Sequence, residues 1–241
     1  MADAKNESNW QPTAKRFITF LDIMGFKELV LRSSHKEIYE LLSELSQIRS
    51  FVEKIPDGDD VKDAEIYTAS FSDSIILFSK NNSIECFKAQ IYASSWLFAK
   101  SIEKNIPMKG AIAYGEISLN KSKQIYFGQP LIDAYLLEEE LNYYGIIAHH
   151  SLVKFVQDNK NDINLDRFLF EAPAPLKGGL ITHTHIDWFA DLTGPTNDKE
   201  YSTDFKEIFK NKIETLSGTV SGLPRKYLDN TVKVFEDRYE K

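Results

Sequence analysis

The sequence of 241 residues contains a single cysteine, Cys86, so the chain cannot form a disulfide within itself. That composition is typical of a protein in a reducing compartment, and we expect this one in the cytoplasm. No apolar run approaches the roughly 20 residues that a membrane-spanning helix requires. The polar N-terminus also lacks the apolar segment of a signal peptide. The sequence therefore argues against a membrane protein or a secreted one.

Basic residues are also scarce, with 29 Lys and Arg against 36 Asp and Glu, which gives a net charge of −7. Nucleic acid binding needs clustered Lys and Arg to contact phosphates, so a nucleic acid is not the expected main partner. The Gly-x-x-x-x-Gly-Lys-Ser/Thr motif does not occur either, which excludes a phosphate-binding loop of that kind. Any nucleotide chemistry must therefore use other residues.

Segments with the patterns of strands and helices alternate along the first two thirds of the chain. The predicted strands are residues 16–23, 65–72, 74–79, 108–119, 124–127 and 146–149. The predicted helices are residues 27–55, with a break at Ser33 and Ser34, then 83–105 and 128–142. This order predicts an α+β fold, with an antiparallel-rich sheet built on a ferredoxin-like βαββαβ core and helices on one face.

The last third is less regular. Residues 168–189 predict a long hairpin that turns at residues 172–175, and residues 204–217 and 225–239 predict two closing helices. We therefore divide the chain into three parts: a flexible arm at 1–15, a large domain at 16–193, and a helical extension packed on it at 194–241.

Two of the predicted strand segments carry an aspartate among apolar residues. Asp22 lies in the stretch 17–26 and Asp73 in the stretch 69–78. A buried carboxylate is costly unless something neutralises it, and a divalent cation is a common answer. If the two strands are neighbours, both carboxylates can bind one cation or a cation pair, which predicts a metal-dependent nucleotide site. The alternative is that both aspartates only cap turns at strand ends.

Four segments in order resemble the catalytic domain of class III nucleotidyl cyclases, over roughly residues 16–152. They are residues 22–26, 71–74, 109–115 and 128–138. The resemblance implies a homodimer with shared sites, in which Mg²⁺ or Mn²⁺ promotes attack of the ribose 3′-hydroxyl on the α-phosphate. It implies that Asp22, Asp73 and the Ile23 carbonyl bind the metals. Backbone N–H groups at Phe26, where a helix begins, are expected to contact the phosphates.

The sequence departs from the purine-specific members of that family at four positions. The two residues that read a purine base fall on Ala69 and Ile125, whose side chains cannot hydrogen-bond to a base. The asparagine and arginine that stabilise the transition state fall on Ile132 and Leu136. Lys109 is the candidate replacement for the missing catalytic cation; the alternative is a lysine that faces solvent.

A closer match exists to the pyrimidine cyclases of the bacterial Pycsar anti-phage system. The matching segments are residues 20–27, 72–74, 109–116 and 127–138, although that family usually has Arg where Lys109 stands. The resemblance implies that UTP or CTP is converted to a cyclic nucleotide, which a separate effector protein senses. Tyr67, on the same strand face as Ala69, is expected to contact the smaller base.

Two other functions stay open from the sequence. The first is an adenylate or guanylate cyclase that reads its base through other residues. The second is a catalytically silent cyclase-like domain that binds a nucleotide or a partner, as the apolar Ile132 and Leu136 suggest.

Overall fold

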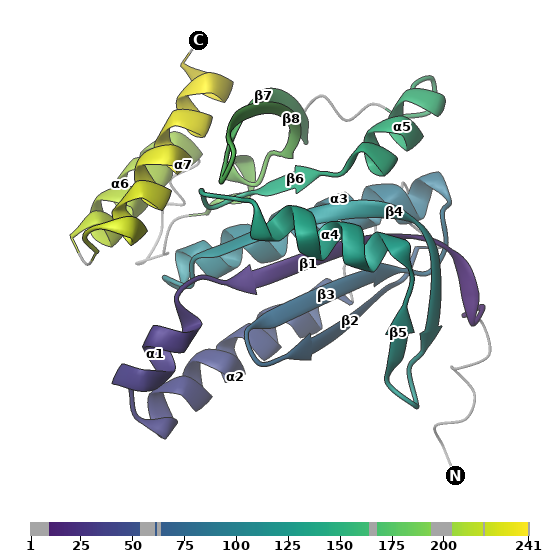
Figure 1. Cartoon of the computed structure of the whole chain (residues 1–241), viewed down its shortest axis with the longest axis horizontal. Coiled ribbons are helices and arrows are strands. Elements are labelled where there is room, and N and C mark those ends of the chain that lie inside the picture. The colour runs from purple at the N-terminus through teal and green to yellow at the C-terminus, as the bar shows by residue number, and fades with distance from the viewer. Residues whose placement is uncertain are drawn as a thin grey trace.

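The computed structural model describes residues 10–53, 61, 64–163, 168–193, 204–218 and 220–240. At its centre is an eight-stranded sheet in the order β2-β3-β1-β4-β6-β8-β7, with β5 paired to β4 (Figure 1). The strands are β1 Thr13–Ile23, β2 Ile66–Phe71, β3 Ser74–Ser79, β4 Met108–Asn120, β5 Ile125–Phe127, β6 Ile146–Ala148, β7 Leu169–Leu176 and β8 Gly179–Ile186.

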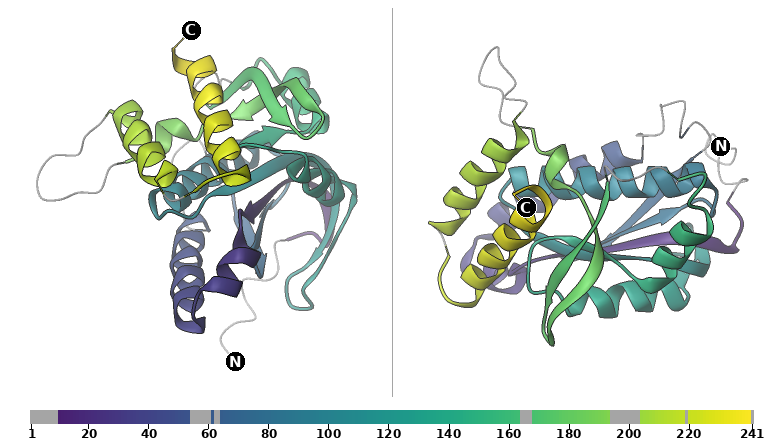
Figure 2. Two further views of the ribbon diagram at one scale, coloured as in Figure 1. Left: turned by 60° about the vertical axis from the view of Figure 1, so that its left-hand side comes forward. Right: turned by 90° about the horizontal axis from the view of Figure 1, so that it is seen from above.

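Helices lie around this sheet, and the last two helices of the chain lie together at one side of it (Figures 1 and 2). The helices are α1 Phe26–Arg32, α2 His35–Val52, α3 Ile84–Glu103, α4 Gln129–Glu139, α5 His150–Asp158, the short 3₁₀ helix η3 Phe189–Asp191, α6 Phe205–Ser217 and α7 Leu223–Tyr239. Ser34 caps α2 and Ser83 caps α3 with their side chains, as Ser residues before helices commonly do. Within the described residues, no helix has the length and apolar character needed to cross a membrane.

The strand pairing is antiparallel throughout the described sheet except between β4 and β6, which run parallel. The predicted α+β fold with an antiparallel-rich sheet is therefore confirmed. β1 begins at Thr13, three residues before the predicted strand, and pairs along its whole length with β4. Residues 1–9 of the predicted arm and the predicted boundary at residue 194 lie outside the described residues.

Helices cover both faces of the sheet, whereas the sequence predicted helices on one face only. The ring of Phe17 in β1 lies 5.2 Å from that of Phe87 in α3. Phe20, on the opposite face of the same strand, lies 5.4 Å from Tyr135 in α4. Successive side chains of a strand point to opposite faces, and in β1 both sets are apolar, so both faces need cover. In Figure 1, α4 lies in front of the strands and α3 behind them.

The hairpin of β7 and β8 turns at Lys177 and Gly178, so the turn predicted at residues 172–175 is wrong. Pro173 and Pro175 lie inside β7 instead. A proline cannot donate to a strand ladder, but β7 is the last strand of the sheet and has a neighbouring strand on one side only. An edge position therefore tolerates both prolines.

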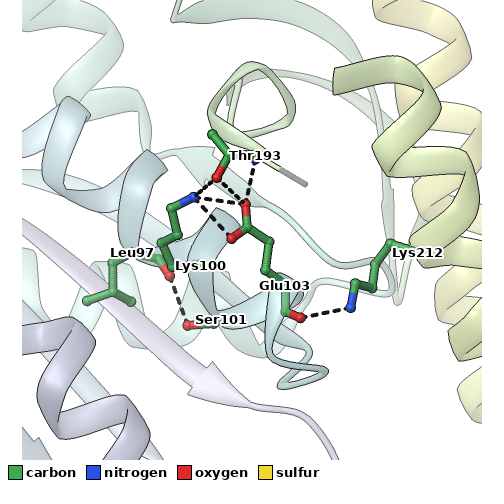
Figure 3. Close-up of polar contacts among 6 residues, drawn as sticks. All are labelled: Leu97, Lys100, Ser101, Glu103, Thr193 and Lys212. Atoms are coloured by element: carbon green, nitrogen blue, oxygen red, sulfur yellow. Dashed lines mark hydrogen bonds and ion pairs between the residues drawn. The ribbon is translucent and has the colours of Figure 1, made fainter. Parts of the chain in front are cut away.

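A polar network joins the end of α3 to Thr193 and α6 (Figure 3). Lys100 lies 2.9 Å from the carboxylate of Glu103, and the Thr193 backbone N–H donates to that carboxylate at 2.6 Å. Lys212 of α6 donates to the Glu103 carbonyl oxygen at 2.8 Å. Nearby, the rings of Phe209 in α6 and Phe235 in α7 stack with centroids 4.1 Å apart. Polar and apolar contacts together hold α6 and α7 against the sheet domain.

Candidate active site

The structure brings Asp22 and Asp73 together. β1 and β3 are antiparallel neighbours, and the Ile23 backbone N–H donates to the Asp73 carbonyl oxygen at 3.1 Å. Asp22 stands opposite Ser74 of β3 on one side and opposite Lys109 of β4 on the other. Both aspartates are half-buried. Two carboxylates from segments 51 residues apart therefore lie at one end of the central strands.

A tight hairpin places Asp73 at this position. β2 ends at Phe71 and β3 begins at Ser74, and these two residues pair with each other. Ser72 and Asp73 thus form a two-residue loop, in which Ser72 has a φ of 56°. A positive φ at the first loop position is characteristic of the hairpin turns whose twist matches that of the strands. The turn holds Asp73 beside the end of β1.

The surroundings of Asp22 favour its uncharged form. Burial and the nearby charge of Asp73 raise the pKa of Asp22 to about 6. The charge of Lys109 and a hydrogen bond from the Ser74 hydroxyl oppose that shift without cancelling it. The Ser74 bond is long, with 3.3 Å between Oγ and Oδ1. A cation placed between Asp22 and Asp73 would relieve this repulsion.

The donors fit a hard divalent cation that shares its ligands with a substrate. In the described residues, no cluster of three or more His, Cys, Asp or Glu side chains forms a complete metal cage. Mg²⁺ typically binds one or two carboxylates and takes its remaining ligands from phosphates and water. Asp22 and Asp73 supply that carboxylate pair, and Ile23 follows Asp22 at the end of β1. The residues present therefore fit a divalent cation such as Mg²⁺ or Mn²⁺ that takes its remaining ligands from other molecules.

Lys109 lies at the site but is not free. Its side chain is largely buried, and its ammonium lies 3.0 Å from the Glu138 carboxylate. The same ammonium donates to the Glu138 carbonyl oxygen at 3.1 Å. Burial raises the pKa of Glu138 to about 7, and Lys109 counteracts part of that shift. The alternative of a solvent-facing lysine is wrong, because the ammonium is fixed to the end of α4.

Sequence reasoning missed Glu138. The residue is 3% exposed and belongs to the last turn of α4. A signal was present, because a buried lysine in an apolar strand requires an acidic partner. Finding that partner requires the register of α4 over β4, which the sequence does not give.

Tyr67 lies on the same face as Asp22, at the other end of the strands. Its hydroxyl is 2.6 Å from the hydroxyl of Tyr126 in β5, and its ring stacks on Phe78 at 6.1 Å. The ammonium of Lys121 lies 4.7 Å from the ring centre. Burial, then the bond to Tyr126, raise the pKa of Tyr67. Tyr67, which the sequence predicts to contact the base, therefore belongs to an aromatic cluster that includes Phe78 of β3 and Tyr126 of β5.

Of the other predicted positions, Phe26 is buried, whereas Ile125, Ile132 and Leu136 are exposed. Phe26 is the first residue of α1, directly after Gly25, whose φ of 72° favours glycine. The positions of the missing polar residues are exposed apolar side chains, at 47% for Ile125, 52% for Ile132 and 53% for Leu136. These three predicted positions therefore present apolar side chains at the surface.

No family model matches the sequence, and no curated protein matches it. Solved structures do. The monomeric guanylyl cyclase domain of the RhoGC fusion protein from Blastocladiella emersonii aligns with 74% of this chain and 98% of its own, at 12% identity and a TM-score of 0.54. The guanylate cyclase domain of RhGC from Catenaria anguillulae, in complex with GTP, aligns over 72% and 96%, at 13% identity and a TM-score of 0.53.

A bacterial light-regulated adenylyl cyclase aligns with 74% of this chain and 92% of its own, at 15% identity and a TM-score of 0.50. At such identities the likeness is one of fold. The chain has the fold of a class III cyclase catalytic domain. The resemblance recognised in the sequence is confirmed to that extent.

Proposed function

We propose that this chain is a divalent-metal-dependent nucleotidyl cyclase that converts UTP or CTP to the 3′,5′-cyclic nucleotide and pyrophosphate. The observation that carries the proposal is the half-buried pair Asp22 and Asp73, adjacent at the strand ends of a cyclase fold. Bound Mg²⁺ or Mn²⁺ would supply activation of the ribose 3′-hydroxyl and neutralise charge at the α-phosphate.

The residues of the chain have distinct roles in this proposal. The carboxylates of Asp22 and Asp73 and the carbonyl of Ile23 hold the cation. The turn at Gly25 directs the backbone N–H of Phe26 toward the phosphates, where the start of a helix favours negative charge. These groups orient the triphosphate so that the α-phosphate lies next to the attacking hydroxyl.

The outer face of α4 supports a homodimer. Ile132, Tyr135 and Leu136 are exposed there, and Phe71 at the tip of the β2–β3 hairpin is 87% exposed. Ile132, Tyr135 and Leu136 are neighbours on the helix surface, and adjoining exposed apolar side chains are typical of a surface that another protein covers. A second copy related by twofold symmetry would cover it and close the pocket over the base and α-phosphate. Each site would then combine the carboxylates of one subunit with α4 of the other.

The preference for a pyrimidine rests on the apolar residues at the base-reading positions. Ala69 and Ile125 offer no hydrogen bonds to a purine, and Tyr67 lies on the same face as Ala69. UTP is favoured over CTP on the Pycsar resemblance alone. That resemblance also extends the proposal to a cytoplasmic second messenger in anti-phage defence. The product would act on a separate effector that does not contact this chain.

Two alternatives have their own observations. A purine cyclase is favoured by the names of the structural neighbours, which are guanylyl and adenylyl cyclases. A silent nucleotide-binding domain is favoured by Ile132 and Leu136, and by the fixing of Lys109 to Glu138. Either alternative keeps the fold and changes the chemistry.

Turnover of the four nucleoside triphosphates distinguishes the three hypotheses: a pyrimidine cyclase, a purine cyclase and a silent domain. The purified protein is incubated with each triphosphate and Mn²⁺ or Mg²⁺, and products are identified by mass spectrometry. Cyclic UMP or cyclic CMP as the main product supports the proposal, and cyclic AMP or cyclic GMP supports the purine alternative. Nucleotide binding without any cyclic product supports the silent domain. Asp73→Ala is the inactive control, and Asp162→Asn, in an exposed turn after α5, is the matched active control.

Mixing two damaged chains tests the shared site. Asp73→Ala removes a carboxylate from one half-site, and Ile132→Asp alters α4 in the other. Random exchange makes about half of the dimers mixed, each with one intact site of two, so we expect recovery of about a quarter of the wild-type rate. Size-exclusion chromatography confirms that both variants still form dimers. Mixtures that never regain activity, or a fully active monomer, contradict the shared site.

A further inference from the structure

The ammonium of Lys109 has two acidic neighbours and pairs with one of them. Lys109 and Asp22 are direct partners in the register of β4 and β1. Opposite residues in an antiparallel pair have Cβ atoms about 5 Å apart on the same face, well within the reach of a lysine. Among the ion pairs of the described residues, however, that of Lys109 is with Glu138, at 3.0 Å. The Asp22 carboxylate, although it is opposite Lys109 in the sheet, therefore has Asp73 and Ser74 as its interacting neighbours instead.

The packing of α4 explains this choice. Pro130, Ala134 and Glu138 are spaced four residues apart and are all buried, so they form the helix face that lies on the sheet. Pro130 lies against Gly115, where an added Cβ would approach its Cγ to 2.7 Å. Ala134 packs with Phe20 and Ala113. The next position along that face is Glu138, which the packing of α4 therefore places beside Lys109.

The end of α4 strengthens the hold on Lys109. The ammonium donates to the Glu138 main-chain carbonyl as well as pairing with its carboxylate. The Glu138 carbonyl also accepts from the Leu141 backbone N–H at 3.0 Å, and a carbonyl oxygen has two lone pairs, so it can accept from the ammonium as well. The helix dipole favours a cation at this end of α4. Lys109 thus has a charge partner and a carbonyl partner on α4, and both draw it away from β1.

We propose that Glu138 is a positioning residue, which draws the Lys109 ammonium off Asp22 and so leaves the Asp22 carboxylate open to a divalent cation. This inference rests on the proposed metal site and adds a residue that the cyclase resemblance does not assign. Without Glu138, the ammonium would turn to Asp22, its register partner, and compete with the cation for the same oxygens. Glu138 therefore acts through Lys109 and does not itself contact the metal or the substrate.

The test is the affinity of the full chain for Mn²⁺ without nucleotide, measured from the electron paramagnetic resonance signal of free Mn²⁺. Glu138→Gln keeps the side-chain volume and removes the charge that holds Lys109, so Mn²⁺ binding should weaken by about tenfold. Lys109→Met removes an ammonium that Glu138 already holds away from Asp22, so binding should stay close to that of the wild type. When Glu138→Gln is added to Lys109→Met, the affinity should not change further.

The double variant separates positioning from a direct effect. If Glu138→Gln weakens Mn²⁺ binding equally with and without Lys109, Glu138 acts by its own charge and the proposal is wrong. It is also wrong if Glu138→Gln leaves the affinity of the otherwise wild-type chain unchanged. If the wild type shows no Mn²⁺ binding that depends on Asp73, the proposed function fails and this inference fails with it.

Two further variants guard against a loss of structure. Glu138→Asp keeps the charge and retracts it by one methylene, so it should weaken Mn²⁺ binding by less than Glu138→Gln does. Asp187→Asn disturbs a buried ion pair at the end of β8, away from the site, and should leave Mn²⁺ affinity unchanged. Thermal unfolding of each variant shows whether it is folded. A change in Mn²⁺ affinity with Asp187→Asn as large as that with Glu138→Gln would overturn the proposal.

Discussion

Two aspartates at strand ends, Asp187 and Asp22, differ in the hydrogen-bond donors and charges that surround them. Asp187 directly follows β8 and is 1% exposed. Its Oδ2 accepts from Arg238 Nε at 2.8 Å and from the Tyr239 hydroxyl at 2.6 Å, both on α7. Asp22, near the end of β1, accepts one long hydrogen bond from Ser74 and faces the charge of Asp73.

This difference separates an aspartate that holds the fold together from one suited to bind a cation. Burial raises the pKa of both carboxyl groups. For Asp187, the bonds from Tyr239 and Arg238 oppose that shift. For Asp22, a second carboxylate adds to it. A buried carboxylate with one oxygen that accepts from an arginine and a tyrosine holds two elements together, whereas one with a single long hydrogen bond beside another carboxylate is suited to bind a cation.

The largest contrast is expected in catalysis. Asp73→Ala should lower cyclase turnover by at least about a thousandfold, because it removes a ligand of the cation that the reaction needs. The dimer should stay folded, since the change relieves Asp22 of a like charge. Asp187→Ala should leave the turnover of the folded protein near that of the wild type. Rates normalised to folded protein check this, and substantial activity of Asp73→Ala with Mn²⁺ would refute the metal assignment.

Stability should show the reverse order. Asp187→Ala takes away the carboxylate that Arg238 and Tyr239 both contact. We expect the free energy of unfolding to fall by about 3 kcal/mol, as for other broken buried ion pairs. Thermal unfolding monitored by circular dichroism measures the loss. A variant as stable as the wild type would mean that the Asp187 contacts do not hold α7 in place.

A smaller loss of stability is expected when only one of the two donors to Asp187 is removed. Tyr239→Phe removes the 2.6 Å hydrogen bond to Asp187 and keeps the ring, which packs against Phe235 at 5.2 Å. Loss of one hydrogen bond to a charged acceptor should cost about 1.5 kcal/mol. The same unfolding measurement applies. A loss as large as that for Asp187→Ala would show that the hydroxyl, not the ion pair, dominates.

The smallest predicted effect is a gain in stability, and it comes from a substitution of Asp22 at the candidate active site. The pKa of Asp22 is about 6 in the fold against an ordinary value of 3.8, so the folded state binds a proton more tightly than the unfolded chain. The stability from this group is complete below pH 4 and is lost as the pH rises through 6. Asp22→Asn should therefore stabilise the metal-free protein by about 1 kcal/mol at pH 7.5, after discounting for partial exposure, and not at pH 4.

Unfolding at both pH values tests this prediction. Asp187→Asn serves as the comparison and should be destabilised at pH 7.5. If Asp22→Asn is less stable than the wild type at pH 7.5, then Asp22 is not a strained carboxylate, and the contrast between the two strand ends disappears.

The sequence was sufficient for the features that local pattern determines. Asp22 and Asp73 could be recognised because carboxylates stand out in short apolar strands, and Ser34 and Ser83 because they precede helices. The order of strands and helices then pointed to the fold class. The signal of each aspartate and each helix start lies within a short stretch of neighbouring residues.

The features that were missed depend on tertiary position. The helix α5 follows a strand of three residues, and its polar start at His149 and His150 resembles a strand end. The turn of the β7–β8 hairpin was misplaced because the strongest local turn signal, the prolines, lies on an edge strand. Glu138 could not be paired with Lys109 because 29 residues separate them and only the packing of α4 joins them.

The prolines of β7 also limit how copies of the protein can associate. An exposed edge strand is a template on which another chain can add a strand, and repeated addition leads to fibres. Pro173 offers no N–H for such pairing, and at Pro175 the carbonyl already accepts from the Asn142 backbone N–H at 2.9 Å. Leu141 forms a bridge with Leu176 beside it. The second half of β7 is therefore closed to strand exchange, so the sheet cannot be extended into another copy of the protein at these residues.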